Sequence, residues 1–135
     1  MSAVLQPTRS APTPAAMGAA GLRAFARIAA AWGLGVDEQR RLLGEPPRST
    51  FFAWRKAPDK AMLTRDTLER LSLLLGIYKS LQILLPEPKA ADAWVKQPNA
   101  AFGGNTALAV MLAGNVGDLL SVRRWLDAAR SGGWS

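Results

Sequence analysis

The sequence contains no cysteine and no histidine among its 135 residues. Without cysteine the chain can form no disulfide, no thiolate metal site and no thiol nucleophile. Without histidine it lacks the side chain most often used as a general base and the commonest protein ligand of transition metals. Both absences argue against catalysis and against a bound metal or cofactor. They also suit a reducing compartment, so we expect a cytoplasmic protein.

The carboxylates that remain do not form an obvious catalytic pair. Asp118 and Asp127 fall on one predicted helix, nine residues apart. A helix has about 3.6 residues per turn, so this spacing places the two carboxylates on opposite faces. The Gly103-Gly104 pair precedes a predicted helix and is weak evidence for anion binding on its own. We therefore expect a protein that binds a partner and is not an enzyme.

The chain also lacks a hydrophobic run long enough to cross a membrane, which requires about 20 apolar residues. Its longest apolar stretch runs from Leu71 to Leu85 and is interrupted by polar and small residues. We therefore expect no membrane partner.

Positive charge is concentrated in the first half of the chain. The formal net charge is +7. Residues 1–65 contain ten Arg and Lys against four Asp and Glu, whereas residues 66–135 contain seven against six. The basic half is suited to an anionic partner such as a nucleic acid, and the nearly neutral half to a protein.

Apolar residues recur at intervals of three and four through most of the chain, and no segment shows the alternation of a strand. We therefore predict an all-α fold. Thr64 and Asn115 are suitable N-caps for two of its helices. The predicted helices are Gly18 to Trp32, Val36 to Leu43, Arg48 to Lys56, Arg65 to Leu85, a short helix through Ala91 to Lys96, Asn105 or Thr106 to Ala113, and Asn115 to about Arg130.

These elements divide into three parts. Residues 1–17 are rich in proline and small residues and are expected to form a disordered tail. Residues 18–61 form a three-helix region, and residues 62–135 form a long helix followed by a small helical domain. The stretch 71–85 is apolar almost all round, so it must be buried. We expect a homo-oligomer that covers it; the alternative is complete burial within one protomer.

Residues 36–56 follow the order helix, glycine turn, helix that is typical of a helix-turn-helix. The N-terminus of the second helix has a cation and two hydrogen-bonding side chains, which suit contacts with base edges or phosphates. Two further cations at its end suit phosphates. The candidate DNA-binding residues are therefore Arg48, Ser49, Thr50, Arg55 and Lys56.

The apolar residues Phe51, Phe52 and Trp54 would anchor this second helix to its support. Two features depart from the usual motif. Gln39-Arg40 replaces the small residue common in the first helix, and the Glu45-Pro46-Pro47 turn is about one residue longer than usual. The alternative interpretation is a three-helix core with solvated arginines and no DNA contact.

The rear half has a set of motifs in a fixed order. They are Trp94, Pro98-Asn99, Phe102-Gly103-Gly104, Gly114-Asn115 and the run from Val122 to Ala128. In this order and spacing they resemble the C-terminal toxin-binding domain of the Xre/MbcA/ParS antitoxins. The resemblance is close over residues 62–133 and looser over residues 20–60. One departure is Ala107, where relatives often have a proline after the capping residue.

The resemblance implies a function. Members of this family neutralise a toxin of the RES-domain type, an enzyme that consumes NAD, and place a helix-turn-helix-like region before the toxin-binding domain. Their C-terminal helix and tail dock at the toxin's active-site entrance. The positions that match here are Arg123, Arg124, Trp125, Arg130, Gly132, Gly133, Trp134 and Ser135.

The sequence analysis therefore predicts a type II antitoxin that blocks a RES-domain toxin and represses its own operon by binding operator DNA. Two alternatives remain. One is a helix-turn-helix transcriptional regulator that has no toxin partner. The other is an antitoxin that has lost DNA binding, which would fit the two departures in residues 36–56.

Overall fold

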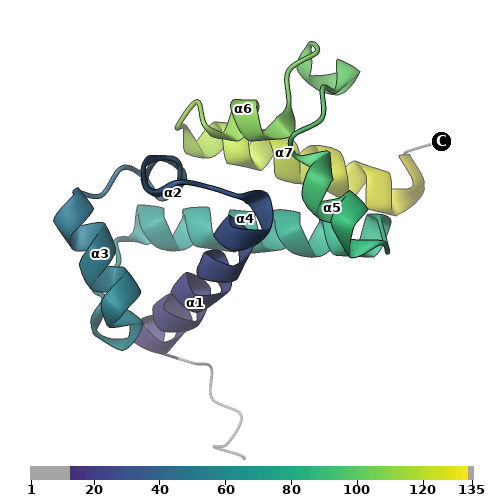
Figure 1. The fold of residues 1–135 in the computed structure, drawn as a ribbon. Coiled ribbons are helices and arrows are strands. Elements are labelled where there is room, and N and C mark those ends of the chain that lie inside the picture. Colours follow the sequence, from purple (N-terminus) through teal and green to yellow (C-terminus); the bar gives the residue numbers. More distant parts are fainter. Residues whose placement is uncertain (1–12, 134–135) are drawn as a thin grey trace, which may run out of the picture.

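The computed structural model describes residues 13–133, and all its regular elements in that range are helical, as the sequence predicts (Figure 1). A single antiparallel bridge joins Pro98 to Thr106. The elements are α1 (Pro14–Trp32), α2 (Val36–Leu42), α3 (Arg48–Lys56), the 3₁₀ turn η2 (Pro58–Lys60), α4 (Arg65–Leu84), α5 (Pro88–Trp94), the 3₁₀ turn η3 (Ala100–Phe102), α6 (Ala107–Met111), α7 (Val116–Ala128) and the π-helical turn η4 (Ala129–Gly133).

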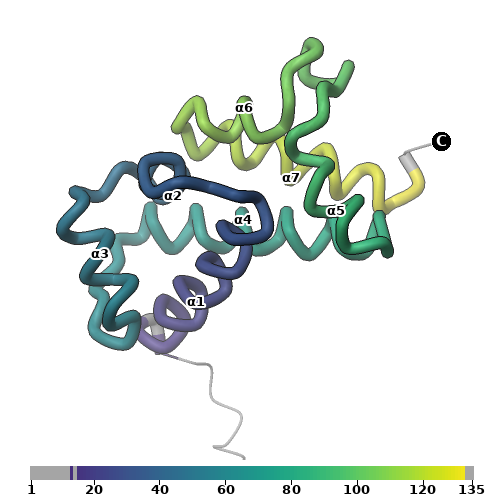
Figure 2. Tube along the Cα trace, in the orientation of Figure 1, coloured from purple at the N-terminus to yellow at the C-terminus, as the bar shows by residue number. Residues whose placement is uncertain are grey.

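The long helix α4 is the centre of the molecule. It contacts α1 on one side and α7 on the other, and these lie below and above it in the view of Figure 1. The path of the chain in Figure 2 shows the same arrangement. The residues of α4 with at most 3% exposure include Leu71, Leu74, Ile77 and Leu81. Elements of the same chain therefore cover most of this apolar helix, although Ile83 remains 50% exposed.

Helix α1 begins earlier than expected. The predicted start was Gly18, with residues 1–17 disordered, but the helix begins at Pro14. The Thr13 hydroxyl accepts a hydrogen bond from the Ala16 amide at 3.1 Å, and proline is suited to the first helical position because its missing N–H would be unpaired there. Residues 1–12 lie outside the described range.

The first three helices pack as a small unit around Gln39, one of the two residues that depart from the usual motif. Its buried amide donates to the Leu34 carbonyl at 3.0 Å and accepts from Arg55 at 2.6 Å. Gln39 therefore links the α1–α2 connection to α3. Its neighbour Arg40 donates to the Pro46 carbonyl at 2.8 Å and so supports the long turn.

The long turn itself requires unusual backbone geometry. Gly44 and Glu45 both have positive φ, at 94° and 60°. Such a conformation is easy for glycine and costly for a residue with a Cβ. The hydrogen bond from the Glu45 amide to the Arg40 carbonyl, at 2.7 Å, compensates for that cost.

The residues predicted as helix caps in the rear half lie at N-cap positions, and two helices differ from the prediction in where they begin or end. The Thr106 hydroxyl caps α6 by accepting a hydrogen bond from the Ala109 backbone amide at 2.9 Å. At the start of α7 the Asn115 backbone amide donates to the Asp118 carboxylate at 3.3 Å. Helix α5 begins at Pro88, so it lies earlier than the predicted Ala91–Lys96. Helix α6 ends at Met111, two residues early.

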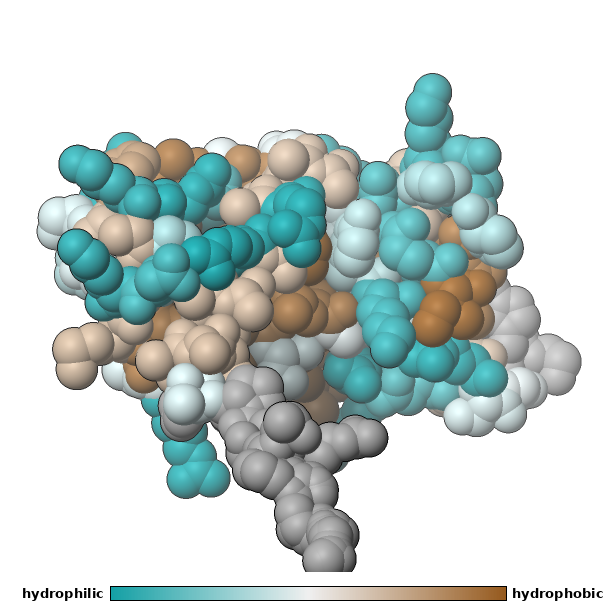
Figure 3. Space-filling view, turned by 90° about the horizontal axis from the view of Figure 1, so that it is seen from below, coloured by the Kyte–Doolittle hydropathy of each residue, from teal (hydrophilic) through white to brown (hydrophobic). Residues whose placement is uncertain are grey.

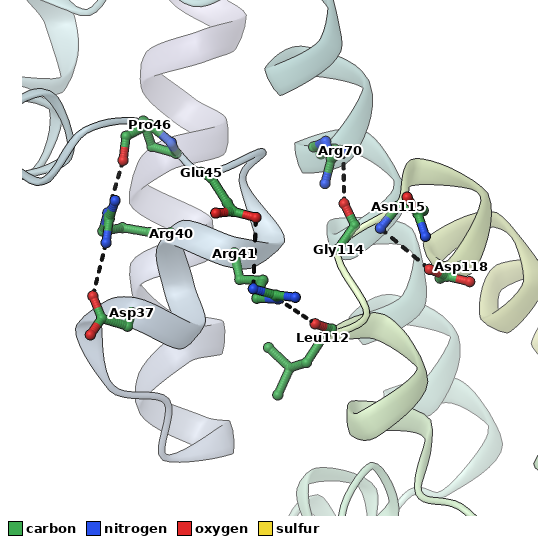
Figure 4. Close-up of polar contacts among 10 residues, drawn as sticks. All are labelled: Asp37, Arg40, Arg41, Glu45, Pro46, Arg70, Leu112, Gly114, Asn115 and Asp118. Carbon is green, nitrogen blue, oxygen red and sulfur yellow. Dashed lines mark hydrogen bonds and ion pairs between the residues drawn. The ribbon is translucent and has the colours of Figure 1, made fainter.

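Two arginines, one on α2 and one on α4, bind the segment that follows α6 (Figure 4). Arg41 on α2 donates to the Leu112 carbonyl at 2.7 Å, and Arg70 on α4 donates to the Gly114 carbonyl at 3.1 Å. Both carbonyls lie just after α6, where a helix leaves its last carbonyls unpaired and carries partial negative charge. Arg70 is buried and is oriented by Asp66 at 2.9 Å. We call these two contacts the arginine clamp.

The clamp yields the first prediction. Arg70→Met keeps an apolar stem but removes both hydrogen bonds and leaves the Gly114 carbonyl unpaired. It should lower the free energy of unfolding by about 2 kcal/mol, measured by urea denaturation. Lys79→Ala, on the exposed side of the same helix, is the control and should change stability by less than about 0.5 kcal/mol. Equal stability of the two variants would show that the clamp contributes little.

Candidate interaction surfaces

Within residues 13–133 no group of three or more acidic side chains is placed to hold a metal ion. The two carboxylates of α7 have local partners. Asp118 accepts from the Asn115 amide, and Asp127 pairs with Arg123 at 3.1 Å. Among the described residues, no helix is both long enough and apolar enough to span a membrane.

The outward face of α3 is the first candidate surface. Exposed residues on it recur at intervals of three and four, as one stripe of a helix requires. The stripe comprises Ser49, Phe52, Ala53 and Lys56. Ser49 and Lys56 were expected to bind DNA, and both are exposed. Thr50 is only half-buried.

The two arginines expected to bind DNA are exposed but already have partners within the chain. Arg48 forms an ion pair with Asp37 at 2.8 Å, and its guanidinium lies 5.7 Å from the centre of the Phe52 ring. Arg55 donates to Gln39 and lies over the Phe51 ring at 5.6 Å. These contacts hold both guanidinium groups in fixed positions beside α3.

Asp37 is the acidic residue at this surface. It accepts hydrogen bonds from Arg40 and Arg48. The hydrogen bond from Arg40 and the positive charge of Arg48 together lower the pKa of this carboxyl below its ordinary value, against a smaller opposing effect of desolvation. The carboxyl is therefore ionised at neutral pH. Its ion pair with Arg48, the first residue of α3, connects α2 to α3.

Phe52 was wrongly assigned to the anchor of α3. Its side chain is 47% exposed, whereas Phe51 is buried and Trp54 half-buried. The helical period contains the signal that was missed, because positions 51, 54 and 55 share one face of a helix and position 52 lies outside it. A large aromatic side chain thus stands on the outer stripe of α3.

The second candidate surface is the outer side of α7 and η4. Arg123 pairs with Asp127, and its guanidinium lies directly over Gly76 of α4, where a Cβ would collide with it. Arg130 donates to the hydroxyl of the buried Ser80 at 3.2 Å. Both arginines therefore attach this segment to α4. Arg124 is exposed.

Trp125 belongs to an aromatic cluster that connects three elements. Its ring stacks on Trp94 of α5, with 5.6 Å between the centres and 28° between the planes. It also lies 6.0 Å from the ring of Phe102 in η3. All three rings are half-buried.

The chain changes direction after α7. Gly132, inside the π-helical turn, has a non-helical φ of 88°, and Gly133 follows it. A residue with a side chain would be strained at this φ, so the position favours glycine. Trp134 and Ser135, the remaining residues of the expected tail, lie outside the described range.

A third surface is an apolar groove between α1 and the first half of α4, with a volume of about 370 Å³. It is lined by Met17, Gly21, Leu68, Leu71, Ser72 and Leu75. A second hollow adjoins it at Leu68 and includes Met62, which is 93% exposed. Figure 3 shows that apolar side chains also gather in several patches on the face seen from below.

Comparison with known proteins agrees with this arrangement. Residues 11–76 match the antitoxin Xre-like helix-turn-helix domain, and residues 80–132 match the antitoxin Xre/MbcA/ParS C-terminal toxin-binding domain. A relative from Sinorhizobium fredii, the uncharacterized protein y4oB, is 50% identical over 113 residues, which are 84% of this chain and 86% of the relative. With both domains present in this order, the chain belongs to the Xre/MbcA/ParS antitoxins.

Proposed function

We propose that this antitoxin binds an NAD-consuming toxin of the RES-domain type and blocks its active site. The observation that carries the proposal is the match of residues 80–132 to the family's toxin-binding domain, together with the glycine pair that follows α7. We take residues 62–135 as the toxin-binding unit, because α7 needs α4 to cover its inner face.

Steric occlusion by the tail is the proposed mechanism. An enzyme that consumes NAD must bind a pyrophosphate and two flat rings, so its pocket can also accept a flat aromatic side chain. The Gly132-Gly133 hinge would direct Trp134 and Ser135 toward that pocket. Arg124, which is exposed, would contact the rim beside Trp125. Arg123 and Arg130 would hold α7 and η4 on α4, so that the hinge starts from a fixed point.

The tail yields the second prediction. Deleting Trp134 and Ser135 should weaken binding of the proposed RES-domain toxin about 30-fold, as loss of one aromatic hot spot does. It should also abolish inhibition in an NAD-consumption assay. Deleting Ser135 alone is the matched control and should retain both properties. If the two deletions behave alike, the antitoxin function stands but occlusion by the indole does not.

We further propose that the front half binds operator DNA, with α3 in the major groove. The support is the match of residues 11–76 to a helix-turn-helix domain and the net charge of +6 in residues 1–65. Lys56 and the fixed Arg48 and Arg55 would contact phosphates, and Ser49 and Thr50 would lie at base edges. The exposed Phe52 would contact a thymine methyl group.

The third prediction concerns this DNA surface. Lys56→Ala should weaken binding to the promoter fragment of the chain's own gene, and it should reduce the slope of log K against log salt by about 1, because one phosphate contact is lost. Phe52→Ala should leave that slope unchanged but lower the discrimination between thymine and uracil in the fragment. The control is Lys89→Ala in the rear half. A protein that binds no promoter fragment but neutralises the toxin would be an antitoxin without DNA binding.

Self-association is the remaining proposal. Met17 in the groove between α1 and α4 and Met62 in the adjoining hollow are both exposed, and covering such apolar side chains would be favourable. We propose that a second copy of the chain covers this groove. The groove includes Leu71, Ser72 and Leu75 from the stretch 71–85 that first indicated an oligomer, although most of that stretch is covered within the protomer.

The fourth prediction tests the groove. Met62→Glu should shift the protein toward the monomer in analytical ultracentrifugation, since a charge would be buried at the contact without a partner. Ile83→Glu introduces the same charge at an exposed apolar residue near the other end of α4 and should leave the mass unchanged. A monomeric wild-type protein would rule out this contact.

A further inference from the structure

The sequence contains a run without charge in its rear half. No charged side chain occurs between Lys96 and Asp118, although 20% of the chain's residues are charged. Charge is usually absent from a segment because the segment is buried. Here part of the run, α6, does contribute buried residues to the core.

The first part of the run is exposed. Residues 97–106, which we call the finger, project away from the helical body between α5 and α6 (Figure 1). Its exposed residues are Gln97, Pro98, Ala100, Ala101, Gly103, Gly104 and Asn105. Burial within the chain therefore does not explain the missing charge in this segment.

The finger holds its own shape. The Asn99 backbone amide donates to the Asn105 backbone carbonyl, and the Gly104 backbone amide donates to the Asn99 backbone carbonyl, both at 3.0 Å. The Asn99 side chain accepts from the Ala101 amide at 2.9 Å. Gly103 and Gly104 have φ of 65° and 86°, and a Cβ on either would have no atom of another residue within 4 Å. The glycines serve the turn, and the space around them is open.

The base of the finger packs against α7. Phe102 lies against Trp94 and Trp125, with ring centres 6.3 Å and 6.0 Å apart. Trp125 is in the same helix as Arg124 and precedes the glycine hinge by two turns. A partner that contacts the outer side of α7 at Trp125 therefore lies beside the finger.

We infer that the finger is a second contact surface for the toxin, separate from the tail. This inference rests on the proposed function. The centres of protein interfaces are depleted of charge, and a loop that is ordered before binding loses little conformational entropy when it binds. The matching toxin surface would be uncharged, with apolar groups and backbone or amide hydrogen-bonding groups toward Pro98, Ala101 and Asn105.

The experiment introduces charge of either sign at one exposed position. Ala101→Glu and Ala101→Lys should each weaken binding of the full-length chain to the proposed RES-domain toxin at least tenfold, measured by calorimetry. Ala30→Glu, at an exposed alanine of α1, is the matched control and should stay within twofold of wild type. Thermal unfolding of each variant shows that the fold is retained.

Three results would overturn the inference. Binding within twofold of the control for both finger variants would leave toxin binding in place and exclude the finger. Weakening by only one sign of charge would assign the effect to the toxin's net charge and exclude an uncharged contact. If the wild-type chain does not bind the protein at all, the proposed function fails together with the inference.

Discussion

The structure depends on the burial of α4 by elements from both halves of the same chain. The helix is apolar around most of its circumference, and α1 and α7 cover opposite sides of it. At about 25 cal/mol per Å² of apolar area, neither side could be exposed without a large loss of stability. The helices before α4 and those after it therefore share one core. This accounts for the positions of the two family matches, which meet near residues 76–80, inside α4.

The shared core and the arginine clamp fix the surface on α3 relative to the surface on α7. Arg41 leaves the first helix of the helix-turn-helix unit and reaches the carbonyl end of α6, while Arg70 reaches the connection to α7. A rigid link of this kind means that a protein bound on α7 and a DNA duplex bound on α3 would have a defined geometry. The intramolecular partners of Arg48 and Arg55 would also favour binding, because side chains that are already ordered lose less entropy when they bind.

The fold could be predicted from sequence because its signals are local. Thr64 and Asn115 cap their helices, and apolar residues repeat at the helical period along α4. The start of α1 was missed because proline was interpreted as a breaker, although Thr13 before Pro14 is a start signal. The site was harder to predict. The contacts of Gln39 with Arg55, and of Arg123 with Gly76, depend on how separate helices pack, and no local pattern predicts them.

The distribution of charge follows the division of tasks. Cations occur where the proposed partner is a polyanion, and the finger, which faces solvent in this chain, contains none. Either property alone has a simple explanation, since arginines are common on surfaces and uncharged segments are common in cores. An exposed, ordered and uncharged segment beside a half-buried aromatic cluster is explained by neither. Its composition is that of an interface, and its place beside Trp125 indicates which partner would cover it.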